Sequence, residues 1–213
     1  KIVQMVTNTV NNNINATVTF KETDLSFFRN FPLASLQIED IAVINKKPFE
    51  GDTLYSAESL SLDMNITELF KKADETINLK NIATSNGKIN ILFNTKGEAN
   101  YNIAIEQETT NNETNSEPFS FNIEGYELQN IDFNYIDESS KINLLLANIN
   151  HTAKGNFAEE ILDLNTNSEA QLSLEMDDVN YMKNLNITLD AIIGIDLKNS
   201  KYTFKENTAH INQ

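Results

Sequence analysis

Two histidines, His151 and His210, are the only imidazole side chains that this sequence offers for catalysis or metal binding. Their contexts, "NHT" and "AHI", have neither the HExxH nor the His-x-His spacing of a zinc site. The chain also lacks cysteine, which excludes disulfides, thiolate catalysis and cysteine metal ligands. We therefore predict two ordinary surface histidines and no metal site.

Carboxylates are abundant, and a pair of them could act as acid and base in a hydrolase. The adjacent pairs Glu159-Glu160 and Asp177-Asp178 do not suit that role, because neighbouring residues of a strand point to opposite faces. No G-x-S-x-G, Walker or dinucleotide-binding glycine pattern occurs, and six glycines make a phosphate-binding loop hard to build. We predict that the protein is not an enzyme and needs no cofactor.

The segment "DLNTNSEAQLSLE" begins like a calcium-binding loop, with Asp163, Asn165 and Asn167 at its first, third and fifth positions. It then departs from the pattern, because Ser168 replaces the glycine of the sharp turn and Leu174 replaces the bidentate glutamate. We therefore predict no calcium site here.

Charge and hydropathy narrow the classes of partner. The chain has 31 acidic and 16 basic residues and a net charge of −15, so its surface repels phosphate backbones and nucleic acid is not an expected partner. The longest apolar runs, residues 144–147 and 191–195, are far shorter than the roughly 20 residues that span a bilayer. With 213 residues, 40% of them hydrophobic, the chain can bury a sizeable core.

Strict alternation of apolar and polar residues is the strongest structural signal. In residues 185–197 every odd position is apolar, which predicts one long strand with one dry face. The same alternation recurs in six further segments: residues 54–66, 89–93, 119–123, 131–135, 142–146 and 172–176. Since parallel sheets are buried on both faces, this pattern predicts an antiparallel sheet. We expect a mostly β protein with a long, curved, groove-like sheet.

Turn and bulge signals interrupt the alternation. Asn86-Gly87 is typical of a type I′ hairpin turn, so we predict a hairpin there. The apolar parity changes between Leu79 and Ile82, which predicts a β-bulge near Asn81.

A few short helices are predicted between the strands. Each follows a residue that can cap a helix, and the four segments are residues 25–31, 68–72, 157–162 and 179–185. Helices of this size cannot cover six or more long strands, so the dry face needs another cover.

The chain divides into two weakly similar β halves, residues 1–106 and 118–213. Residues 107–117 contain no apolar residue and are predicted to be a loop or linker. Residues 89–93 and 131–135 match in pattern at an offset of 42, which indicates a weak internal repeat.

An ordered series of motifs runs from about residue 14 to 105. A Phe-Pro corner precedes "LASLQIEDIAVIN", and "AESLSLDMNITELF" and "INLKNIATSNGKINILFNTKGEANYNI" follow. This order resembles the amino-terminal region of the AsmA family, whose members end the series with a glycine turn and Ala-Asn-aromatic. The last element is present here as Gly97, Ala99, Asn100 and Tyr101.

The resemblance implies a periplasmic protein of Gram-negative bacteria, anchored to the inner membrane by a helix just upstream of Lys1. AsmA-like proteins are grouped with the repeating β-groove, bridge-like lipid-transfer proteins. The resemblance therefore implies a hydrophobic β-groove for phospholipid acyl chains and a role in outer-membrane assembly and integrity. Outer-membrane assembly proteins are candidate partners.

Seven residues in mid-strand on dry faces are the predicted lipid-binding residues: Leu62, Met64, Ile91, Phe93, Ile187, Leu189 and Ile193. Phe27, Phe28 and Phe31 form a predicted apolar corner before Pro32. This corner either caps a hydrophobic core, closes one end of a groove or docks near a membrane.

The alternative hypothesis is an extracellular, adhesin-like β-sandwich module that binds protein or glycan. In such a module, two sheets would cover each other's dry faces and leave no room for an apolar ligand.

Overall fold

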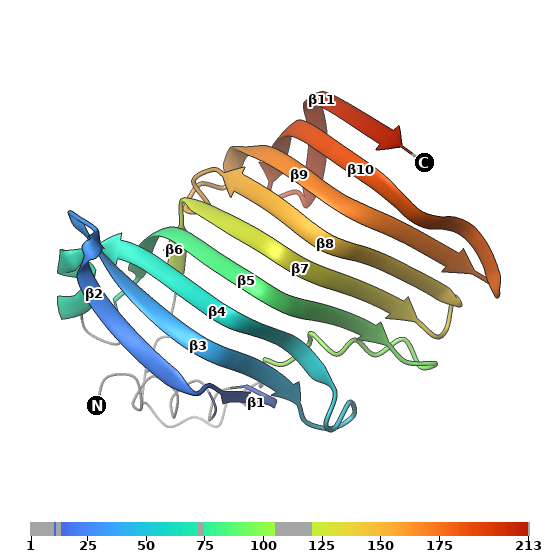
Figure 1. The fold of residues 1–213 in the computed structure, drawn as a ribbon, viewed down its shortest axis with the longest axis horizontal. Coiled ribbons are helices and arrows are strands. Elements are labelled where there is room, and N and C mark those ends of the chain that lie inside the picture. Colours follow the sequence, from blue (N-terminus) through green and yellow to red (C-terminus); the bar gives the residue numbers. More distant parts are fainter. Residues whose placement is uncertain (1–10, 12–13, 72–74, 105–120, 213) are drawn as a thin grey trace.

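The computed structural model shows a nearly all-β chain that forms one large, open sheet (Figure 1). It describes residues 11, 14–71, 75–104 and 121–212. The elements are β1 (Ala16–Thr19), β2 (Glu22–Asn30), β3 (Leu33–Asn45), β4 (Thr53–Asn65), the 3₁₀ helix η1 (Ile66–Phe70), β5 (Ile77–Phe93), β6 (Phe121–Ile123), β7 (Gly125–Asp137), β8 (Ile142–Lys154), β9 (Ile161–Met176), β10 (Val179–Asp196) and β11 (Lys201–Asn212).

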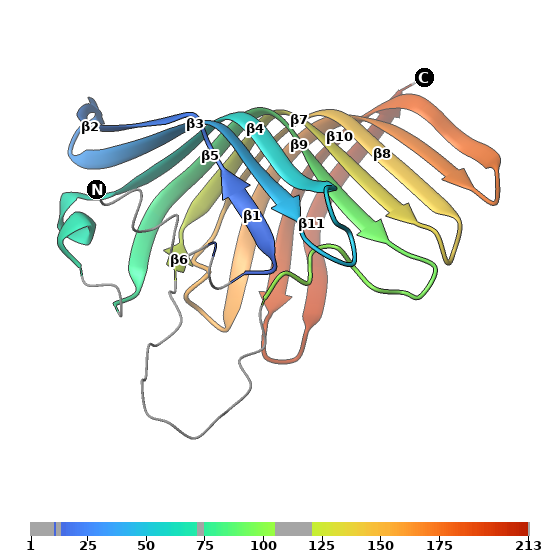
Figure 2. The same ribbon diagram turned by 90° about the horizontal axis from the view of Figure 1, so that it is seen from below.

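The strand order is β1-β3-β4-β5-β7-β8-β9-β10-β11, with β2 beside β3 and β6 beside β5. The predicted antiparallel pairing is confirmed for most strands, but β5 pairs in parallel with β6 and β7. The sheet is not closed, and it arches gently in the view of Figure 2. The predicted long strand is also confirmed, because β10 has 18 residues.

Three of the four predicted helices are wrong. Residues 25–31 lie largely in β2, residues 179–185 lie in β10, and residues 157–162 form a turn and the start of β9. Only residues 68–72 overlap a helix, η1. Residues 25–31 and 179–185 instead pair in part with β3 and β9, and this tertiary context outweighs the weak preference of short helical signals.

The turn between β9 and β10 explains one of these errors. Asp177 and Asp178 both have left-handed backbones, with φ of 49° and 62°, and Met176 pairs with Val179. This is the geometry of a two-residue hairpin turn, which aspartate tolerates because its side chain can bond to the nearby backbone. Asp178 therefore ends a hairpin and does not cap a helix.

The hairpin predicted at Asn86-Gly87 is also wrong, because β5 runs straight through both residues. Asn86 is left-handed, with φ of 51°, and Gly87 lies against β4. A Cβ atom on Gly87 would lie 2.1 Å from the backbone oxygen of Ser56. This glycine therefore serves close approach of two strands and not a turn. The bulge predicted near Asn81 is confirmed, because the β4–β5 register shifts between Asp63 and Met64.

Four left-handed residues stand in a row across the sheet: Asp40 in β3, Asn86 in β5, Asn130 in β7 and Asn148 in β8. The strand registers place them at one level, since Ala57 pairs with both Ile41 and Gly87, Gly87 pairs with Ile131, and Ile131 pairs with Ile149. Asn and Asp are the residues that most readily adopt this conformation. We call this line the left-handed row.

Apolar alternation changes parity at the left-handed row. The flanking apolar residues are Ile38 and Ile41 in β3, Ala57 and Leu60 in β4, Ile82 and Ile89 in β5, Leu128 and Ile131 in β7, and Leu146 and Ile149 in β8. The Tyr55 hydroxyl lies 2.6 Å from Thr84 Oγ1, although these residues stand on opposite sides of the row. The change in parity therefore keeps apolar side chains on one face of the sheet.

Side chains repeat in register between the parallel strands β5 and β7. Three asparagine pairs bond through their amides at separations of 44 residues: Asn78 with Asn122 of β6 at 2.9 Å, Asn86 with Asn130 at 2.8 Å, and Asn90 with Asn134 at 2.8 Å. The segments compared in the predicted repeat thus lie side by side, but the register offset is 44 and not 42.

Two apolar clusters lie at the end of the sheet where β5 and β7 begin. One is built on Ala34, Met64 and Leu79, and the other on Ala153, Leu162, Leu164 and Ile195. The pair Ile82 and Tyr126 links them across β5 and β7. The clusters therefore share one face of the sheet, which we call the apolar face.

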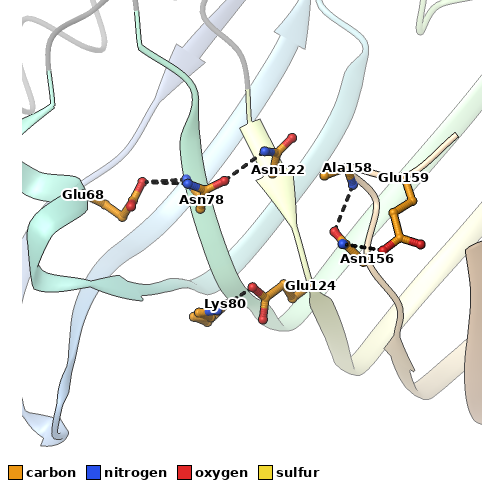
Figure 3. A network of polar contacts seen from close by, with 8 residues as sticks. All are labelled: Glu68, Asn78, Lys80, Asn122, Glu124, Asn156, Ala158 and Glu159. Carbon is orange, nitrogen blue, oxygen red and sulfur yellow. Dashed lines mark hydrogen bonds and ion pairs between the residues drawn. The ribbon is translucent and has the colours of Figure 1, made fainter.

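A polar network ties η1 to this end of the sheet (Figure 3). Glu68 is 7% exposed, and it accepts hydrogen bonds from the Asn78 backbone N–H at 2.7 Å and from Lys71 Nζ at 2.6 Å. Asn78 in turn accepts a bond from the Asn122 amide. Burial, the largest single effect, would raise the pKa of Glu68, but the bonds from Asn78 and Lys71 together hold this pKa below its ordinary value.

We expect Glu68→Gln to lower the free energy of unfolding by about 1.5 kcal/mol at pH 7, because the charged acceptor is lost. Because folding lowers the pKa of Glu68, its contribution is present above the ordinary value of 4.5 and is lost as the pH falls through the folded value. Denaturant unfolding of both proteins from pH 7 to pH 3 measures this. Glu159→Gln is the control, since that exposed carboxylate accepts a hydrogen bond from Asn156, three residues away. A constant wild-type to Glu68→Gln difference across this range would contradict the assignment.

Candidate apolar binding face

The structure places the seven predicted lipid-binding residues on the one sheet but in three separate places. Leu62 and Met64 lie in β4 beside η1, Ile91 and Phe93 lie in β5 beyond the left-handed row, and the other three lie in β10. Five strand intervals separate β4 from β10, or roughly 24 Å at the usual spacing. These residues therefore cannot line one pocket, and only an extended ligand could touch all of them.

Burial differs among these residues. Met64 is buried in the cluster against Ala34 and Leu79, so it belongs to the core. The other six are half-buried: Leu62, Ile91, Phe93, Ile187, Leu189 and Ile193. Half-buried apolar side chains in mid-strand keep part of their surface in water, where an apolar ligand would displace that water.

Local cover lies at both ends of the apolar face. At one end Ile66 and Leu69 of η1 pack on the first cluster, and Phe157 of the β8–β9 connection packs on the second. At the other end Tyr101 contacts Phe93 edge-on, with ring centroids 5.8 Å apart. The middle of the face, around the left-handed row, lies between these covers.

The covering segment at the far end contains the Gly97, Ala99, Asn100 and Tyr101 motif, and each residue has a structural role. Gly97 turns the chain with φ of 76°, and Ala99 pairs with Phe93. Asn100 is 2% exposed, and its amide donates to the Asn90 carbonyl at 2.8 Å and accepts from the Leu92 N–H at 2.9 Å. This motif therefore anchors residues 94–103 to the sheet.

The predicted apolar corner is not buried core. Phe31 is 77% exposed and Phe27 is also exposed, while the side chain of Phe28 lies outside the described part of the chain. Phe70 at the end of η1 is 81% exposed near the same corner, and sequence analysis did not find it. The corner lies in strand β2 and its turn to β3, since no helix forms at residues 25–31.

The prediction of two ordinary surface histidines is wrong for His151. It is half-buried in β8, and its ring contacts Tyr126 with centroids 5.2 Å apart. Nδ1 lies 2.7 Å from Ser168 Oγ, and Nε2 lies 3.1 Å from the Tyr126 hydroxyl. Sequence alone could have placed His151 with Ile149 and Ala153 on the apolar parity of β8. His210, by contrast, is exposed in β11.

Two shallow, open cavities lie at the left-handed row; mostly polar residues line the larger, and Ile41, Ala42 and Ala57 also line the smaller. They measure about 340 and 280 Å³, and Asn86 and Ser56 line both. None of the seven predicted lipid-binding residues lines either cavity. These cavities are therefore separate from the predicted lipid-binding residues.

The last strand, β11, forms one edge of the sheet. Each of its side chains from residue 201 to 211 is exposed, including Tyr202, Phe204 and Ile211. Lys205 stands at a bulge opposite β10 and reaches Asp163 at 2.6 Å. A bulge and a lysine are the usual means by which an edge strand avoids unwanted pairing.

These features define a nearly all-β protein with one open, mostly antiparallel sheet and a broad apolar face. Comparisons with models of known protein families, with curated proteins and with solved structures gave no match. In the part of the chain that the structure describes, no helix is long and apolar enough to cross a membrane. The same residues contain no group of three or more His, Asp or Glu side chains that could hold a metal ion.

Proposed function

We propose that the protein binds the acyl chains of phospholipids, or of similar lipids, along the apolar face and is not an enzyme. The observation that carries this proposal is the set of half-buried apolar side chains on the apolar face of a single open sheet. Large contiguous apolar surfaces on soluble proteins commonly mark binding sites for proteins, membranes or apolar ligands. An extended acyl chain suits this face, because its half-buried apolar residues are spread across many strands.

The resemblance to the AsmA family supports the cellular setting of this proposal. In that setting the full-length protein is periplasmic, is tethered to the inner membrane by a segment before Lys1, and supports outer-membrane assembly and integrity. The face would then act as a groove that holds or conducts lipid between the membranes. The exposed Phe31 and Phe70 stand at one corner of this sheet.

The interaction-module hypothesis has a weaker basis. A β-sandwich needs a second sheet over the dry face, and the described strands belong to one sheet. The exposed edge of β11 favours a protein partner that adds a strand, but its bulge and the Lys205–Asp163 ion pair oppose such pairing. We therefore prefer the lipid hypothesis.

We expect freshly purified protein to carry lipid and to take up a fluorescent fatty acid. Native mass spectrometry and lipid extraction measure the first, and a fluorescence titration measures the second. Protein that is empty and takes up no probe would contradict the proposal.

We expect Leu189→Asp to weaken uptake at least tenfold, about 1.4 kcal/mol, because a carboxylate on the apolar face repels an acyl chain. Thr188→Asp is the matched control, since this neighbour in β10 is exposed and alternation directs it to the opposite face. Circular dichroism shows whether both variants fold. Equal uptake by the two folded variants would place the ligand somewhere other than on this face.

A further inference from the structure

A polar group interrupts the apolar face beside the left-handed row. Strand register places Leu128, His151, Ser168 and Leu189 opposite one another across β7, β8, β9 and β10. Leu189 is one of the predicted lipid-binding residues, so Ser168 lies directly beside it. Tyr126 completes the group through its hydroxyl, 3.1 Å from His151 Nε2.

This group has one more hydrogen-bond donor than its own two contacts use. A neutral imidazole has one N–H and one acceptor nitrogen, and the two hydroxyls add two further donors. If Nδ1 carries the proton, it donates to Ser168, Nε2 accepts from Tyr126, and the Ser168 hydroxyl hydrogen is left over. If Nε2 carries the proton, the Tyr126 hydroxyl hydrogen is left over. Either tautomer therefore leaves one hydroxyl donor without a role inside the group.

The surroundings keep the group neutral and within reach of a ligand. Burial lowers the pKa of His151 and raises the pKa of Tyr126, so both are uncharged near pH 7. All three side chains are half-buried. Among the residues that the structure describes, no other side-chain hydrogen bond uses the Ser168 or Tyr126 hydroxyl. A bound acyl chain would displace water from this group, and the spare donor would then gain from an acceptor on the ligand.

We propose that Tyr126, His151 and Ser168 form a polar subsite on the apolar face that donates one hydrogen bond to an acceptor oxygen of a bound acyl lipid. The acceptor is the carboxylate of a free fatty acid or the carbonyl of an ester, since both offer the same lone pairs. The subsite fixes the position of the polar end of an acyl chain on the apolar face. This subsite rests on the proposed function, the binding of acyl chains along the apolar face.

Competition against a fluorescent fatty acid tests this subsite. We expect palmitate and methyl palmitate to compete about fivefold better than hexadecane, the effect of one hydrogen bond of about 1 kcal/mol. Palmitate presents a carboxylate and methyl palmitate an ester carbonyl, so comparing the two shows which acceptor the subsite takes. If the probe binds and hexadecane competes as well as both, the subsite is overturned and the lipid-binding proposal stands. If the protein takes up neither the fluorescent probe nor any of the three lipids, both proposals fail.

Variants test whether Tyr126, His151 and Ser168 supply the hydrogen bond to the ligand. Removing one hydroxyl still leaves a spare hydrogen on the group, so Ser168→Ala alone should keep the preference for palmitate over hexadecane. The triple variant Tyr126→Phe, His151→Phe, Ser168→Ala removes every donor and should lose that preference while hexadecane binding is retained. Tyr135→Phe is the control, because it deletes a hydroxyl beside Phe93 elsewhere on the sheet. A triple variant that keeps the preference would overturn the assignment.

Imidazole NMR of the wild-type protein avoids any loss of folding in the triple variant. We expect the His151 ring signals to shift on addition of methyl palmitate but not on addition of hexadecane. The exposed His210 in β11 provides the internal control. A His151 signal that responds equally to both compounds, or to neither, would overturn the subsite.

Discussion

Gly87→Ala is expected to lower the free energy of unfolding by about 3 kcal/mol, because a Cβ atom added here makes a shorter contact than one added at any other glycine. The new Cβ atom would lie 2.1 Å from the Ser56 backbone oxygen and 2.9 Å from Ala57 Cβ. Backbone atoms cannot swing aside as a flexible side chain can, so β4 and β5 would have to separate. Ile131, which is fully buried next to Gly87, would lose packing as they do.

Denaturant unfolding of Gly87→Ala and Gly194→Ala measures the effect against a matched control. Gly194 also stands inside a strand, but the nearest atom to its added Cβ is the Cε of Lys205, at 3.0 Å. That side chain is long and half in solvent, so it can move. We expect Gly194→Ala to cost less than about 1 kcal/mol. Similar losses at both positions would show that strand contact at Gly87 is not what makes glycine necessary.

Asn100→Ala is expected to lower the free energy of unfolding by about 3 kcal/mol, because it leaves buried backbone groups without partners. The lost bonds join Asn100 to the Asn90 carbonyl, the Leu92 N–H and, at 3.4 Å, Asn45 Oδ1. Without them residues 94–103 should detach from the sheet and expose Phe93. Hydrogen exchange of the Leu92 amide measures this detachment directly.

Asn134→Ala is the matched control for Asn100→Ala. Its amide donates one bond, to the side chain of Asn90, and it is half-buried. We expect a loss of about 1 kcal/mol or less and no change in exchange at Leu92. An equal loss in the two variants would mean that Asn100 is one polar contact among many and not an anchor.

Exposure of Phe93 also connects this anchor to the proposed function. If residues 94–103 cover one end of the apolar face, Asn100→Ala should change the uptake of the fluorescent fatty acid as well as the free energy of unfolding. Asn134→Ala should leave uptake unchanged.

The left-handed row shows how sequence analysis can fail on a signal that was present. Apolar parity changes between Ile38 and Ile41, and again between Leu128 and Ile131, and an Asp or Asn stands within each interval. Taken singly, such a change indicates a bulge, as it did correctly near Asn81. That five strands make the change at one level became visible only when their registers were known.

The errors at residues 25–31, 86–87 and 179–185 have a common cause. Each segment carries a local signal for a helix or a turn that is worth about 1 kcal/mol or less. Each also lies where a neighbouring strand offers a ladder of backbone hydrogen bonds, as β4 does for β5 and β9 does for β10. Whether a segment pairs in this way depends on contacts with the rest of the sheet, so the outcome cannot be read from the segment's own residues.

By itself the sequence determined that the chain is nearly all-β, with one apolar side to each long strand, because alternation with period two depends only on the residues of that strand. It also excluded cysteine chemistry. The tertiary structure alone decided that β5 and β7 run parallel at an offset of 44, that Gly87 must lack a side chain, and that Tyr126, His151 and Ser168 meet. These features depend on register between strands, which is set by contacts between residues far apart in the chain.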